Sequence, residues 1–212
     1  MGICYIVGAG DCTETIKKQA EDLIIAADGG MRHLLRMGIT PDIFVGDFDS
    51  TDSAGSAPTV LSHPTVKDDT DMSLALREGE ARGYRDFVLL GGLGGTRFDH
   101  SIANLQLLFS AARRGLCVTL LGGDQRTRVL RECEKMTFSP AARGFLSVFA
   151  IGGIATGVCL SGLKYPLKDA TLSPDAPLGV SNEFVGCAAT ISAQTGHLLV
   201  IWQESETEKE KS

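Results

Sequence analysis

Acidic side chains gather near the start of the chain in three short motifs: Asp28-Gly29-Gly30, Gly46-Asp47-Phe48-Asp49-Ser50 and Lys67-Asp68-Asp69-Thr70-Asp71. Asp47 and Asp49 are two residues apart, and in an extended segment such residues point to the same side. Their carboxylates would converge, which is unfavourable unless a cation lies between them. A small number of oxygen ligands suits Mg²⁺, which keeps water molecules and shares its coordination shell with phosphates. An exposed turn explains the pair equally well, because Asp and Ser are common in turns.

The third acidic motif opens a helix that the sequence predicts over residues 70–82. Met72, Ala75 and Leu76 share one face of this helix, and Gly83 follows its end. Thr70 suits the N-cap position, and acidic residues near a helix start interact favourably with the helix dipole. Capping explains one or two of the acidic residues, whereas three beside a lysine exceed what a cap needs.

A glycine-rich loop at residues 91–95 follows a predicted strand at 87–90 and precedes a predicted helix at about 101–114. Such a loop can bring backbone N–H groups and a helix start to a phosphate. It is not a Walker A motif, which ends in Gly-Lys-Ser/Thr. Arg97 adds a side chain that can donate two parallel hydrogen bonds to phosphate. Asp99 can cap the helix and His100 can bond nearby backbone, so both also have structural explanations.

Bulk composition favours a small-molecule ligand. The formal net charge is −6, the pI is about 5.2, and the sequence has no dense Lys/Arg run of the kind that binds nucleic acid. The six cysteines are scattered without C-x-x-C spacing, which is typical of buried free thiols in a reduced compartment. The start of the chain is not typical of a signal peptide, and no apolar run reaches about 18 residues. We therefore expect a cytoplasmic protein.

Alternating strand and helix patterns in the first part of the chain predict an α/β domain over residues 1–122, with a Rossmann-like parallel sheet. We expect strands at 3–7, 23–27, 43–45, 60–62, 87–90 and 117–121, and helices at 13–22, 31–37, 70–82 and 101–114. Continuous apolar strands between helices indicate a parallel sheet that is covered on both faces. Ligands of such sheets bind beyond the carboxyl ends of the strands.

The pattern changes after residue 122. Short apolar or alternating runs occur at 127–130, 136–138, 145–149, 155–160, 180–184, 187–192 and 197–201, with turn residues between them. They predict a smaller antiparallel β-sandwich domain over residues 123–203. Residues 204–212 are almost wholly polar, which predicts a disordered tail.

Several of these motifs together make the chain resemble the thiamine pyrophosphokinases. The acidic motifs occur in the order of that family, with further matches at Pro41-Asp42, Arg97-Phe98-Asp99-His100, Asn104-Leu105, Gly162-Leu163-Lys164-Tyr165-Pro166-Leu167 and Ser181-Asn182-Glu183. The resemblance runs from about residue 3 to about residue 202. One departure is Thr96, which separates the second glycine pair from Arg97.

The resemblance implies a reaction and a first set of site residues. The family transfers the β,γ-diphosphate of ATP as one unit to the hydroxyethyl group of thiamine, giving thiamine diphosphate and AMP. The implied catalytic residues are Asp47, Asp49, Asp71 and Asp99, of which Asp47, Asp49 and Asp71 should hold Mg²⁺. The implied nucleotide-binding residues are Asp28, Gly29, Asp69, Thr70, Gly92, Gly95, Arg97 and His100. Asp69 or Asp99 should complete the metal shell or orient the hydroxyl.

The resemblance also implies a thiamine site and a partner. Ser181 and Asn182 should meet the thiamine pyrimidine, and Tyr165 should offer an aromatic face to that ring. Members of the family are homodimers whose sites form where the α/β domain of one subunit meets the β domain of the other. We therefore expect a homodimer that binds thiamine and ATP, and neither nucleic acid nor membrane.

Three other functions compete with this interpretation. A haloacid-dehalogenase-type phosphatase also has a D-x-D after a strand, with the first Asp as nucleophile, although there it usually follows the first strand. A nucleotide-sensing module would keep the fold without turnover. A related pyrophosphokinase would act on another alcohol, such as a pterin.

Overall fold

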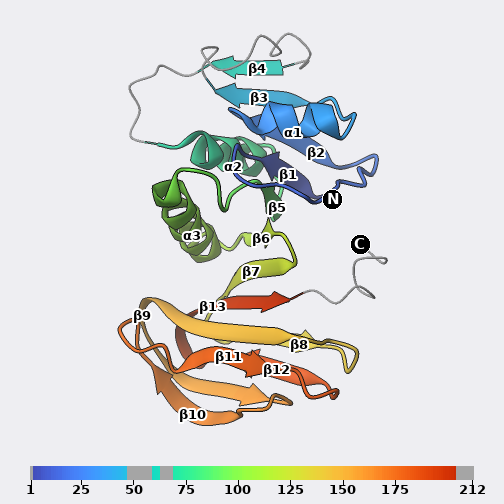
Figure 1. Cartoon of the computed structure of the whole chain (residues 1–212). Coiled ribbons are helices and arrows are strands. Elements are labelled where there is room, and N and C mark those ends of the chain that lie inside the picture. Colours follow the sequence, from blue (N-terminus) through green and yellow to red (C-terminus); the bar gives the residue numbers. More distant parts are fainter. Residues whose placement is uncertain (1, 47–58, 63–68, 204–212) are drawn as a thin grey trace. The chain divides into compact units, whose positions relative to one another are not determined.

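The computed structural model describes residues 2–46, 59–62 and 69–203, with the side chains of 60–62 excepted. The chain divides into two compact units. The first comprises residues 1–107 and 115–123, and the second comprises residues 108–114 and 124–212. Figure 1 shows the elements of both units.

The first unit is built on a parallel sheet, as predicted. Its strands are β1 (Cys4–Val7), β2 (Leu23–Ala27), β3 (Ile43–Gly46), β4 (Thr59–Ser62), β5 (Asp86–Leu90) and β6 (Cys117–Gly122). They lie in the order β4-β3-β2-β1-β5-β6, and every pair within this set is parallel. Strands β1 to β4 therefore follow one another toward one edge of the parallel sheet. The chain then returns to the other side of β1, where it adds β5 and β6. The crevice for a ligand is expected at this reversal, beyond the carboxyl ends of β1 and β5.

Helices pack on both faces of the parallel sheet. Helix α1 (Gly30–Arg36) buries Met31 and Leu34 in one hydrophobic cluster with Ile24 of β2. Helix α2 (Asp71–Ala81) covers the other face, where Gly79 lies directly against Phe87 of β5. Helix α3 (Phe98–Arg113) begins three residues before its predicted start. Among the described helices, none is long and apolar enough to cross a membrane.

The prediction of a helix at residues 13–22 is wrong, because residues 11–22 form neither a helix nor a strand. Hydrogen bonds to side chains hold the backbone of this region in another arrangement. A carboxylate oxygen of Glu14 accepts from the N–H of Thr13 at 2.9 Å, and Asp22 accepts from the N–H groups of Ile3 and Gln19, each at 2.8 Å. The segment thus connects β1 to β2 as irregular chain, with Cys12 and Ile16 in the same hydrophobic cluster as Met31 and Leu34 of α1.

The cysteines are free thiols, but the expectation that they are buried holds only in part. Cys4 and Cys12 are buried, whereas Cys133 and Cys187 are exposed. Burial raises the pKa of the Cys4 thiol to about 12, so this group stays protonated and unreactive at neutral pH.

The second unit contains antiparallel strands. They are β7 (Gln125–Leu130), β8 (Lys135–Phe138), β9 (Phe145–Ser161), β10 (Leu167–Leu172), β11 (Gly179–Glu183), β12 (Ala189–Ser192) and β13 (Thr195–Gln203). The sequence did not predict β10, and its runs at 145–149 and 155–160 are one strand, β9. The first half of β9 pairs with β11 and β13, and its second half pairs with β10 and β12. One hydrophobic cluster contains residues from both halves, so β9 joins two layers around a shared core.

Candidate functional site

Two glycine-containing loops interlock through their backbones at the carboxyl ends of β1 and β5. The N–H of Gly8 donates to the carbonyl of Leu90, that of Gly10 to Gly91, and that of Asp11 to Leu93, at 2.8 to 2.9 Å. Gly91 has a φ of 60°, and a Cβ at this position would lie 2.3 Å from the carbonyl oxygen of Gly8. Only glycine therefore permits this approach. The contact lies at the reversal of strand order, where the topology places a ligand.

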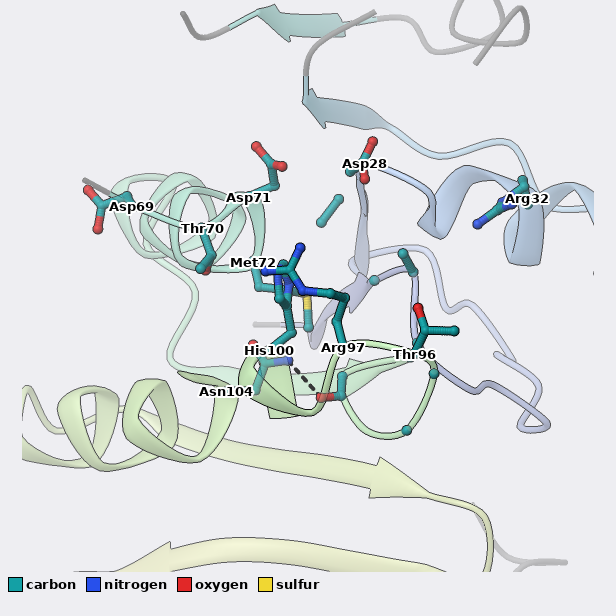
Figure 2. A pocket seen from close by; sticks show the side chains of 18 residues that line it. Asp28, Arg32, Asp69, Thr70, Asp71, Met72, Thr96, Arg97, His100 and Asn104 are labelled. Atoms are coloured by element: carbon teal, nitrogen blue, oxygen red, sulfur yellow. Dashed lines mark hydrogen bonds between the residues drawn. The ribbon is translucent and has the colours of Figure 1, made fainter. Parts of the chain in front are cut away.

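A cavity of about 770 Å³ opens beside these loops (Figure 2). The two loops contribute residues 8–10 and most of 91–97 to its wall. The end of β2, Arg32 of α1, the start of α2 and the first turns of α3 contribute the rest. The starts of α2 and α3 thus both meet the cavity, and helix starts carry partial positive charge that favours anions. The volume suits a small-molecule ligand.

Most of the predicted nucleotide-binding residues lie together in this wall. Those that line the cavity are Asp28, Asp69, Thr70, Gly92, Gly95, Arg97 and His100, and the predicted metal ligand Asp71 lines it as well. Gly29 lies next to the wall as the N-cap of α1. Asp47 and Asp49 lie outside the described residues, so their roles stay predictions.

Other lining residues were not predicted as site residues, among them Gly8, Gly10, Arg32 and Met72, together with Asn104, which was named only as part of a family motif. Gly8 and Gly10 follow the first strand directly, so the carboxyl-end rule could have found them. Met72 resembles any apolar residue on the buried face of a helix. Nothing in the sequence distinguishes Arg32 from an ordinary exposed arginine on a helix.

The start of α2 is fixed by side-chain bonds. Thr70 is the N-cap, as predicted, and its hydroxyl accepts from the N–H of Ser73 at 3.2 Å. The carboxylate of Asp69 accepts from both terminal nitrogens of Arg77, at 2.8 and 3.0 Å, and from the hydroxyl of Ser73 at 3.3 Å. These bonds make Asp69 an anchor of the helix start, and they place Asp71 in the first turn at the cavity.

Asp28 adopts an unusual backbone conformation at the end of β2. Its φ is 46°, in the left-handed region that residues other than glycine seldom occupy. Its N–H donates to the carbonyl of Val45 at 2.8 Å, which fixes this conformation. Strain of this kind concentrates at functional sites. It directs the side chain of Asp28 into the cavity wall shared with Asp71 (Figure 2).

Arg97 is held by Asp99 in a two-pronged ion pair at the start of α3. The Nε of Arg97 donates to Oδ1 of Asp99 at 2.9 Å, and Nη2 donates to Oδ2 at 2.6 Å. Hydrogen bonds from Arg97 lower the pKa of Asp99 to about 2, and the same bonds raise the pKa of Arg97. Both groups are therefore charged at any ordinary assay pH. The geometry makes Asp99 the support of Arg97, and its predicted direct catalytic role stays a prediction.

Asn104 locks the second glycine loop to α3. The side chain is buried, and its Nδ2 donates to the carbonyl oxygen of Gly92 at 2.7 Å. The bond is drawn in Figure 2. It holds the loop against the helix whose start meets the cavity.

The described residues offer oxygen ligands to a metal ion without forming a complete site by themselves. Among them, no group of three or more His, Cys, Asp or Glu side chains is arranged to hold a metal. The carboxylates of Asp28 and Asp71 both line the cavity, and oxygen ligands of this type suit Mg²⁺.

The predicted thiamine residues lie in the second unit. Asn182 is buried, its Oδ1 accepts from the N–H groups of Tyr165 and Glu183 at 2.9 Å each, and its Nδ2 donates to the carbonyl of Tyr165 at 2.7 Å. Asn182 therefore fixes the backbone that carries Tyr165, a residue that is 57% exposed. Ser181 is exposed with a φ of 57°, and its N–H donates to the hydroxyl of Ser147 at 3.1 Å.

Comparisons with known proteins point to one family. Residues 15–120 match the model described as "Thiamin pyrophosphokinase, catalytic domain", and residues 135–198 match "Thiamin pyrophosphokinase, vitamin B1 binding domain". The chain is 28% identical over 185 residues to the thiamine pyrophosphokinase of Bacillus subtilis, with 84% of this chain and 86% of the relative covered.

Solved structures agree with these sequence matches. The crystal structure of the Bacillus subtilis enzyme has a TM-score of 0.84 and 25% identity, and the match covers 97% of this chain and all of that one. The thiamin pyrophosphokinase of Geobacillus thermodenitrificans gives a TM-score of 0.82 and 25% identity, with 97% and 99% covered. The yeast enzyme, at 16% identity, shares the fold with a TM-score of 0.73 and coverage of 99% and 88%.

Replacement of Asn182 by Ala tests its place in the second unit. The change leaves two backbone N–H groups and one carbonyl without their buried partner, so we expect a loss of about 2 kcal/mol in the free energy of unfolding. Denaturant titration measures this loss. The exposed neighbour provides the control, because Ser181→Ala should change stability by less than about 0.5 kcal/mol.

Steady-state kinetics separate the two positions further. Ser181→Ala should raise the KM for thiamine more than the KM for ATP. Equal stability of the Asn182→Ala variant and the wild type would show that Asn182 does not anchor Tyr165.

Proposed function

The chain belongs to the thiamin pyrophosphokinase family, and from this premise we propose how its own residues carry out the reaction. The enzyme transfers the diphosphate group of ATP to the hydroxyethyl group of thiamine, giving thiamine diphosphate and AMP. The observation that carries the proposal is the cavity at the reversal of strand order, lined by glycine loops, two helix starts and Arg97. Family membership decides against the phosphatase, nucleotide-sensing and pterin alternatives.

The triphosphate of ATP lies, in this proposal, along the interlocked glycine loops. Backbone N–H groups can approach phosphate oxygens closely where glycine leaves no side chain in the way. Arg97 is already oriented by Asp99 and donates to phosphate without a further loss of side-chain freedom. Arg32 also lines the cavity and brings a second positive charge to it.

The residues proposed for Mg²⁺ are Asp71 together with Asp47 and Asp49. The oxygen-only ligand set fits this ion, and Asp71 lies at the cavity. When bound, Mg²⁺ offsets negative charge that develops on the phosphate oxygens. Without a cation, the carboxylates of Asp28 and Asp71 would repel the triphosphate. The acidic side of the cavity is thus compatible with ATP only in the presence of a metal.

Transfer of the diphosphate is a displacement at the β-phosphorus. The thiamine hydroxyl oxygen forms a bond to this phosphorus, the bond to the oxygen that bridges to the α-phosphate breaks, and AMP leaves. The proton of the hydroxyl goes to a neighbouring carboxylate or to water. Such a reaction depends chiefly on positioning and on stabilising charge, which the glycine loops, Arg97 and the helix starts supply.

Thiamine binding is proposed for the second unit. Tyr165 presents an exposed ring on a backbone that Asn182 fixes, so a flat heterocycle can stack on it without reordering the loop. Ser181, which precedes Asn182 in β11, offers an exposed hydroxyl. In this assignment Asn182 acts by positioning Tyr165, while Ser181 and Tyr165 touch the vitamin.

A homodimer is proposed for the active state. Apolar side chains are exposed around β11, namely Phe145, Leu178, Val180 and Val185. Such exposure in one region indicates a surface that another protein covers. Light scattering at micromolar concentration should give the mass of two chains, and a fully active monomer would contradict the dimer.

The reaction and its metal carboxylate are tested with wild-type protein and the Asp71→Asn variant. Incubation with ATP, Mg²⁺ and thiamine, followed by chromatography, should yield thiamine diphosphate and equimolar AMP. Asp71→Asn should fold normally and lose kcat by about 100-fold or more, because stabilisation of transition-state charge is removed.

Asp86→Asn is the matched control, because Asp86 is exposed at the opposite end of β5 from the cavity. It should keep wild-type turnover. ADP with thiamine monophosphate would contradict diphosphate transfer, and near-wild-type turnover of Asp71→Asn at low Mg²⁺ would contradict the metal assignment.

A further inference from the structure

The irregular chain after β1 needs an external support. Residues 8–10 line the cavity, yet the chain that follows them to residue 19 has neither helix nor strand to hold it in place. One side of this segment is bonded to the second glycine loop through the N–H groups of Gly10 and Asp11. Its other side faces α1.

Two side chains of helix α1, one helical turn apart, form hydrogen bonds with this segment. Nε2 of His33 lies 2.8 Å from the carbonyl oxygen of Gly10, and Nη2 of Arg36 donates to the carbonyl oxygen of Cys12. The same Nη2 lies 3.2 Å from Nδ1 of His33. The carbonyl groups of Gly10 and Cys12, the residues before and after Asp11, are thus both bonded to one helix.

The partners of His33 determine the role of each ring nitrogen. A carbonyl oxygen can only accept, so Nε2 carries the proton and donates to Gly10. The other nitrogen, Nδ1, is then an acceptor that faces the donor Arg36. His33 is half-buried and does not line the cavity, so it can act on a ligand only through the loop.

We propose that His33 is a positioning residue for nucleotide binding, which holds the Gly8–Gly10 loop in its phosphate-binding shape through the carbonyl of Gly10. The proposal rests on the assignment of ATP to this cavity. Gly10 is bonded in both directions, by its N–H to Gly91 and by its carbonyl to His33. Without the His33 bond, the peptide between Gly10 and Asp11 is no longer held by α1. The loop must then be ordered again each time the nucleotide binds.

Kinetics and calorimetry of three variants test this role. His33→Ala should raise the KM for ATP about fivefold, as the loss of one hydrogen bond predicts, with kcat and the KM for thiamine within twofold of wild type. His33→Gln keeps an N–H donor of similar reach and should restore most of the ATP affinity. His197→Ala is the matched control, because His197 is also half-buried but packs on the ring of Phe109 in the second unit.

Titration calorimetry with ATP and Mg²⁺ in the absence of thiamine keeps this test independent of turnover. His33→Ala should weaken ATP binding by the same factor even if the wild type formed no thiamine diphosphate, in which case only the proposed reaction would fail. An unchanged ATP affinity in His33→Ala would overturn the proposal. So would failure of His33→Gln to recover affinity, or equal losses for ATP and thiamine, which would indicate a general structural defect.

Discussion

The backbone contact between the loops that follow β1 and β5 is the constraint on which the site depends. Two adjacent parallel strands deliver their chain ends to the same place, and the loops must pass each other there without side chains between them. Gly8, Gly10 and Gly91 make this possible, because each brings a carbonyl or an N–H where a Cβ would clash with backbone. The cavity wall is therefore backbone, which is the surface best able to surround phosphate oxygens.

Around this contact, several groups of the cavity wall are each held by a partner side chain. Asp99 orients Arg97, Arg77 ties down Asp69 beside Asp71, and Asn104 fixes the carbonyl of Gly92. The same logic applies in the second unit, where Asn182 holds the backbone of Tyr165. Such support limits the motion that must be lost when substrates bind, and so favours the geometry that diphosphate transfer needs.

Sequence reasoning succeeded where one physical signal dominates. Continuous apolar runs such as 23–27 and 87–90 predicted the parallel strands, and the carboxyl-end rule placed the glycine loop and the start of α2 on the side of the sheet where the cavity lies. It failed at residues 13–22, where Glu14 accepts from the N–H of Gly123 and Asp22 accepts from the N–H of Ile3, because such contacts join segments that are far apart in the sequence. His33 was missed for the same reason, since its contact with the carbonyl of Gly10 joins residues 23 positions apart. The function of Asn182 was predicted as direct contact with thiamine, whereas its bonds to Tyr165 became visible only in the fold.

Amide hydrogen exchange with a non-hydrolysable ATP analogue and Mg²⁺ tests most directly whether the interlocked loops form the nucleotide site. A ligand slows exchange in the segments whose opening it opposes. The account predicts slower exchange in peptides that cover residues 8–11, 69–73 and 91–97, and little change across residues 135–198 while thiamine is absent. Slowing confined to residues 135–198, or none in the two glycine loops at saturating nucleotide, would contradict the account.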